Sequence, residues 1–103
     1  MIGHYSIIQY HSNPVRQEGT NWGVILVRSN YATLVKIQET SNKDFDGKLE
    51  ALKVKILNTI FTVNDLRNWP RYPANDNFQL TYPVSLFMTT EDTISELYNS
   101  LVI

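Results

Sequence analysis

The sequence predicts an α+β domain in which three antiparallel strands are followed by helices, a further strand and a closing helix. Apolar residues alternate or run continuously through residues 5–39, as strands do, and then recur at helical spacing from Phe45 onward. A loop rich in proline and asparagine at residues 70–77 separates this helical part from a second extended stretch. We expect the helices to pack on the sheet as a two-layer α/β sandwich.

The first three strands are predicted as a meander. Residues 5–11 carry apolar groups on both faces, and residues 22–27 are almost wholly apolar and rich in β-branched residues, which is typical of a central strand covered on both faces. Ser29 and Asn30 form a plausible two-residue hairpin turn, because Asn tolerates a positive φ. Residues 31–39 then continue as the third strand, with one face made by Thr33, Val35 and Ile37.

A long helix is predicted after Ser41, which with Asp44 resembles a capping box, although Asp44 could itself be the cap. Its apolar stripe recurs at helical spacing. Residues 64–68 predict a second short helix that ends before Pro70. The stripe of the long helix consists of Phe45, Leu49, Leu52, Ile56 and Ile60, widened by Leu57 and Phe61.

The last part of the chain is predicted to return to the sheet and then close with a helix. Residues 78–82 resemble a strand that ends or lies at an edge near Pro83, because proline cannot donate a ladder bond. Residues 84–88 continue as extended chain. Thr89 and Asp92 indicate a helix start, and we expect the strand to join the sheet beside the first strand. The closing helix has an apolar face of Ile94, Leu97, Tyr98 and Leu101.

Length and composition indicate a single globular domain spanning residues 1–103. The chain is 43% hydrophobic and 18% charged, which argues against disorder. It contains no cysteine, which excludes disulfides, thiolate metal sites and a cysteine nucleophile. The net charge of -1 gives no strong field toward nucleic acid or an anionic membrane. No apolar run is long enough to span a bilayer, and we expect a cytoplasmic protein without a cofactor.

The polar loop before the second strand is the first candidate site. Arg16 could grip a carboxylate or phosphate with Glu18 orienting it, while Asn21 and Trp22 lie where the loop enters the strand. The alternative interpretation is structural: the loop is pinned by its own ion pair, and its polar side chains bond the local backbone. We favour the structural interpretation but retain these four residues as candidate binding residues.

A second candidate site interleaves two arginines with two aromatic residues, namely Arg67, Trp69, Arg71 and Tyr72. These residue types are enriched in protein-binding hot spots. They can also stack on bases and neutralise phosphates, although the balanced charge of the chain argues against nucleic acid. In a third interpretation Trp69 and Tyr72 tuck against the edge of the core.

The chain resembles an uncharacterised bacterial family, domain of unknown function 3037. The resemblance is carried by residues 5–10, by Asn13-Pro14-Val15-Arg16 with Glu18, by Asn21 and residues 23–26, and by residues 80–83 and 96–102 near the end. Trp22 and the loop at residues 70–77 depart from that pattern. The resemblance implies a fold but no reaction. Some members occur in gene neighbourhoods with kinase-like toxins, which implies partnership with another protein.

The sequence offers little for catalysis. His4 and His11 point to opposite faces of one strand, so they do not predict a metal site. Neither a phosphate-binding glycine loop nor a nucleophile elbow occurs. An enzyme would have to use His11 with Arg16 and Glu18, which requires the three side chains to converge in one pocket.

We therefore predict a non-catalytic protein-interaction module that regulates or inhibits a partner protein, for example a toxin or the target of a mobile-element inhibitor. The alternatives are a nucleic-acid-binding protein that uses residues 67–72 and a small enzyme around His11. Another protein is the expected partner, without a membrane. An exposed edge of the small sheet also offers a route to a homodimer.

Overall fold

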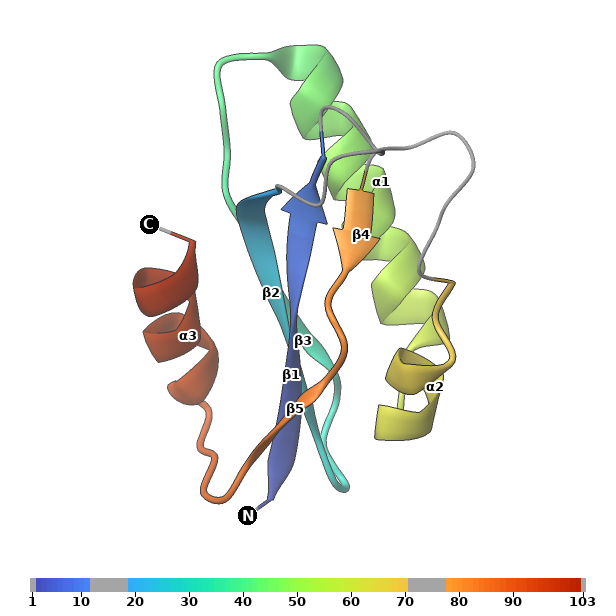
Figure 1. Ribbon diagram of the computed structural model, residues 1–103, viewed down its shortest axis with the longest axis vertical. Helices are drawn as coiled ribbons and strands as arrows, with labels where there is room; N and C mark the ends of the chain where they lie inside the picture. Colours follow the sequence, from blue (N-terminus) through green and yellow to red (C-terminus); the bar gives the residue numbers. More distant parts are fainter. Residues whose placement is uncertain (1, 12–18, 71–77, 103) are drawn as a thin grey trace.

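The protein is built on one five-stranded antiparallel sheet with the strand order β3–β2–β1–β4, and β5 also pairs with β1 (Figure 1). The computed structural model describes residues 2–11, 19–70 and 78–102. The strands are β1 (Gly3–Tyr10), β2 (Thr20–Arg28), β3 (Leu34–Ile37), β4 (Phe78–Leu80) and β5 (Val84–Leu86). The helices are α1 (Lys43–Thr59), α2 (Val63–Arg67) and α3 (Thr93–Leu101).

The predicted α+β class and strand order are confirmed. The meander β1–β2–β3 is antiparallel throughout, and β4 and β5 pair with the other edge of β1. A turn at Ser29 and Asn30 is confirmed, because Asn30 has a φ of 65° and the amide of Tyr31 donates to the carbonyl oxygen of Arg28 at 3.3 Å. The predicted two-residue hairpin is wrong, since β2 and β3 pair only from Leu26 and Leu34, which leaves a longer connection. The third strand is shorter than predicted, since only residues 34–37 join the ladder.

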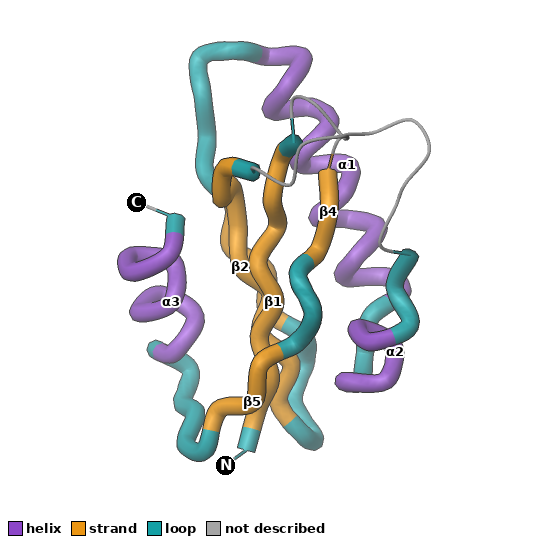
Figure 2. The backbone as a smooth tube through the Cα atoms, viewed as in Figure 1, coloured by secondary structure: helices purple, strands orange, loops and turns teal. Residues whose placement is uncertain are grey.

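The helices cover both faces of the sheet, which corrects the predicted two layers to three (Figure 2). On β3, Val35 and Ile37 pack against the core beneath α1, whereas the ammonium of Lys36 lies 4.7 Å from the ring centre of Tyr98 in α3. Because neighbouring residues of a strand point to opposite faces, α1 and α3 must lie on opposite sides. Both faces of β2 are apolar and buried, so one layer of helices would leave half of it in water.

The larger core lies between the sheet and α1 with α2. Leu49 and Ile56 are the fully buried residues of α1, seven positions apart on one helix face, and Leu66 of α2 joins them. An aromatic cluster closes one end of this core around Phe45. The ring of Phe45 lies within 5.5 Å, centre to centre, of Tyr10, Trp22 and Phe78.

The helix ends show which local signals were correct. The N-cap of α1 is Asn42 rather than Ser41 or Asp44, because the side-chain oxygen Oδ1 of Asn42 accepts from the main-chain amides of Asp44 and Phe45, both at 3.1 Å. The short helix predicted at residues 64–68 is confirmed as α2. It begins with a complete capping box formed by Thr62 and Asp65.

Candidate protein-binding surfaces

Two of the predicted front-loop residues, Asn21 and Trp22, lie at the start of β2 and point to opposite faces. The amide of Asn21 donates to the carbonyl oxygen of Leu101 at 2.8 Å and accepts from Gln9 Nε2 at 2.9 Å. The side chain therefore joins β1, β2 and the end of α3. Its amide oxygen and nitrogen are both engaged within the protein, but with a distant main-chain carbonyl and a side chain rather than with the local backbone that the structural interpretation predicted.

Trp22 faces the α1 side and is half-buried. Its ring lies 4.7 Å from that of Phe45, and its indole Nε1 donates to Thr20 Oγ1 at 2.7 Å. The register of β1 with β2 shifts between Ile8 and Gln9, and Trp22 is the β2 residue without an opposite partner. The bulge places Trp22 on the α1 face together with its neighbour Gly23, whose Cβ direction points at Ile8 and Ile37 of the same core. Arg16 and Glu18 lie outside the described residues, so their predicted role stays a prediction.

His11 directly follows β1 and is buried, so it is not placed as an exposed general base would be. The side chain is 7% exposed, and its Nε2 has no hydrogen-bond partner within the described residues. A Cβ placed on Gly19 would lie 2.7 Å from this ring nitrogen. Glycine at position 19 therefore allows the chain to pass directly against the imidazole. Whether His11 converges with Arg16 and Glu18, as the enzyme alternative requires, is not tested.

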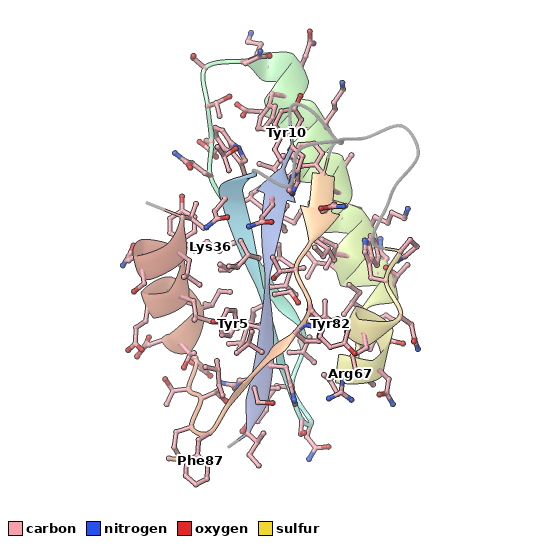
Figure 3. The ribbon with its side chains drawn as sticks, in the orientation of Figure 1. Tyr5, Tyr10, Lys36, Arg67, Tyr82 and Phe87 are labelled. Atoms are coloured by element: carbon pink, nitrogen blue, oxygen red, sulfur yellow. The ribbon has the colours of Figure 1, made fainter. Side chains whose placement is uncertain are left out.

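In the second predicted site, as in the first, two of the four candidate residues lie in the described part of the chain and two lie outside it. Arg67 is exposed at the end of α2 and its Nη1 lies 3.4 Å from Asn64 Oδ1, with Arg67 as donor (Figure 3). Trp69 is half-buried against the core, and the ammonium of Lys55 lies 5.3 Å from its ring centre. The interpretation that Trp69 tucks against the core edge therefore agrees with its position. Arg71 and Tyr72 lie outside the described residues.

Sequence reasoning missed an exposed apolar group at the end of α1. Val54 is 50% exposed, Leu57 38% and Phe61 63%. We call these three residues the α1 patch. Leu57 and Phe61 were expected to widen the buried stripe, which is wrong for two reasons. Leu57 lies about 100° around the helix from Ile56, and Phe61 follows the end of the helical backbone, where Ile60 is extended.

A sequence signal for the α1 patch does exist. Val54 and Leu57 are three residues apart, so they share a helix face that is offset from the face of Leu49 and Ile56. Two apolar faces on one helix indicate that one of them is not in the core. Residues 51–63 contain Lys53 and Lys55 and no acidic residue, whereas Asp65 of α2 accepts a hydrogen bond from the main-chain amide of Phe61 at 2.9 Å.

A second exposed apolar group follows the edge strand β5. Phe87 is 85% exposed, Met88 70%, Tyr82 66% and Val84 47%. We call residues 82–88 the edge segment. The sequence predicted an edge near Pro83 but did not predict that the side chains around it would be so exposed.

Neither a metal centre nor a membrane span is found in the described part of the chain. Within residues 2–11, 19–70 and 78–102, no cluster of three or more His, Asp or Glu side chains could hold a metal ion. None of the helices described is both long enough and apolar enough to cross a membrane.

Comparisons with protein-family models, with curated proteins and with solved structures found no match for this chain. The resemblance to the domain of unknown function 3037 family therefore stays a prediction. The surfaces described above, rather than a relative, must carry any argument about function.

Proposed function

We propose that the protein is a non-catalytic interaction module that binds another protein through the α1 patch and the adjoining α2. Three exposed apolar side chains in succession, Val54, Leu57 and Phe61, are the observation that carries this proposal. Exposed apolar side chains gathered on one part of a surface favour contact with another macromolecule. Binding there would regulate or inhibit the partner, in the cytoplasm.

The charges around the α1 patch favour one kind of partner. Lys53 precedes Val54 in α1 and Arg67 is exposed on α2, whereas the ammonium of Lys55 lies over the ring of Trp69. Arginine and aromatic residues are enriched in the energetic centres of protein interfaces. An apolar partner surface with an acidic rim would be complementary to both the patch and its surroundings.

Site-specific photo-crosslinking tests this proposal. A photoreactive phenylalanine analogue at position 61 should capture the partner in cells of the native organism, and the same analogue at position 87 should not. The captured protein would then be purified and titrated with wild-type protein and with a Leu57→Ser, Phe61→Ser double variant. Loss of two apolar contacts should weaken binding by about tenfold or more.

Phe87→Ser serves as the matched control, because it removes an exposed phenylalanine from a different surface. It should leave the affinity for the captured protein unchanged. Equal affinity of wild-type protein and the double variant, with both chains folded by circular dichroism, would reject the α1 patch as the binding surface.

A further inference from the structure

The edge segment is unusual because it is apolar, exposed and uncharged at a sheet edge. In the described part of the chain, β5 pairs with β1 alone, so its other side faces outward. No residue from 78 to 90 is charged. Natural proteins usually protect such edges with charged side chains, especially lysine, or with proline. Here Pro83 is the only such residue, and it lies just before the strand rather than within it.

We propose that a second copy of this chain covers the edge, with the two β5 strands paired antiparallel across a two-fold axis at Ser85. The sequence around Ser85 is complementary to itself in this register. Val84 of one copy would lie opposite Leu86 of the other, and Phe87 and Met88, where the chain bends after β5, would flank this short ladder near Pro83 and Tyr82 of the other copy. Apolar residues therefore meet apolar residues on both sides of the central Ser85 pair, and no like charges face each other.

The individual pairs are of favourable types. Methionine sulfur makes stabilising contacts with aromatic rings, which suits Met88 of one copy near Tyr82 of the other. The two Ser85 hydroxyls would be neighbours on the other face of the joined sheet. Because Val84 and Leu86 share a face with their partners Tyr5 and Gly3 on β1, the pairing would extend the apolar α3 side of the sheet across both copies.

The exposed area is sufficient for a specific dimer. An aromatic side chain buries roughly 150–250 Å², and Tyr82 and Phe87 are exposed together with Met88 and Val84. Ile2 adds to them, since it is 58% exposed and precedes Gly3, the partner of Leu86. These side chains offer on the order of 600 Å² per copy, close to the ~800 Å² per partner of a standard interface.

Cysteine crosslinking tests the register directly, because the natural chain has no cysteine. Directly opposite residues of antiparallel strands have Cα atoms about 4.5–5.5 Å apart, within the range of a disulfide. Under mild oxidation, Ser85→Cys should form a covalent dimer at least about tenfold faster than the exposed control Ser100→Cys in α3, because dimerisation raises the effective thiol concentration. Equal rates for the two variants would overturn the proposed register.

Sedimentation equilibrium of the full chain tests the dimer itself. Wild-type protein should show a concentration-dependent dimer, and Phe87→Asp should raise the dissociation constant by about tenfold or more by placing a charge in the contact. Phe61→Asp, which alters an exposed phenylalanine of the α1 patch, should leave the dimer unchanged. A wild-type chain that remains monomeric at millimolar concentration overturns the proposal, as does a dimer that Phe61→Asp weakens as much as Phe87→Asp. Circular dichroism confirms that each variant is folded.

Discussion

The side-chain amide of Asn21 donates a hydrogen bond to the main-chain oxygen of Leu101, at 2.8 Å, across 80 residues of sequence. The same side chain accepts from Gln9 Nε2. One residue at the start of β2 therefore holds the end of the C-terminal helix against the first two strands. This contact connects the predicted loop region to the closing helix and explains why an asparagine is needed there.

Asn21→Leu should destabilise the protein by about 1–3 kcal/mol, because it leaves the Leu101 carbonyl and the Gln9 amide without this partner. Urea unfolding of wild-type and variant protein measures the difference. The control is Asn99→Leu, at an exposed position of α3, which should change stability by no more than about 0.5 kcal/mol. Equal effects of the two substitutions would show that the Asn21 bonds add nothing to stability.

Two glycines should respond to alanine in opposite directions. At Gly23, an added Cβ would lie 2.9 Å from the main-chain oxygen of Lys36, so Gly23→Ala should cost about 1–3 kcal/mol by overpacking. At Gly47 in α1, a Cβ meets nothing within 4 Å, so Gly47→Ala should stabilise by up to about 1 kcal/mol through helix propensity. Thermal unfolding of wild-type protein and of the two variants measures the direction of each change in stability. A stabilising Gly23→Ala would contradict the close contact of β2 with β3.

The capping box of α2 should make stability depend on pH. The main-chain amides of Phe61 and Thr62 donate to Asp65 and hold the pKa of its carboxyl below the ordinary value of 3.8. The stabilising contribution is therefore complete above that ordinary value and is lost as the pH falls through the lower pKa of the folded state. Asp65→Asn removes the charge and its titration.

Wild-type protein should accordingly be more stable than Asp65→Asn at neutral pH. The difference in free energy of unfolding between the two proteins should become smaller as the pH falls. Urea midpoints measured for both proteins from pH 7 down to pH 2 test this expectation. The control is Glu91→Gln, an exposed acid before α3, whose difference from wild type should be small throughout. A difference for Asp65→Asn that grows as the pH falls would contradict the assigned hydrogen bonds.

The aromatic cluster predicts that Phe45 is more important for stability than its half-buried position suggests. Phe45→Leu replaces a ring that contacts Tyr10, Trp22 and Phe78. Aromatic pairs contribute about 0.5–1.5 kcal/mol beyond area burial, so the loss should reach about 1–2 kcal/mol. Phe61→Leu at an exposed position is the matched control and should change stability little. The Trp22 fluorescence should also shift in Phe45→Leu alone.

Local sequence signals predicted much of the fold. Asn30 indicated the turn through its tolerance of positive φ, and Pro83 indicated an edge because it lacks an amide donor. Both depend on the chemistry of one residue and its neighbours. The order of the strands followed from short connections and from the return of extended chain after the helices.

The features that were missed depend on tertiary context. Helices α1 and α3 lie on opposite faces of the sheet because both faces of β2 are buried. The apolar run at residues 22–27 already indicated this burial, but strand periodicity alone did not decide which helix covers which face. The bulge at Trp22 depends on the register with β1. The exposure of Leu57 and Phe61 depends on which of two apolar helix faces meets the sheet.

Because β1 lies inside the sheet, its two edges find their partner strands at different times during synthesis. Residues 3–10 pair on one side with β2, close in sequence, and on the other side with residues 78–86. A nascent chain can form the meander early, but the other edge of β1 must wait until residues 78–86 have left the ribosome. A chain shortened before Phe78 would therefore present a bare strand edge and should aggregate rather than accumulate as a smaller folded unit.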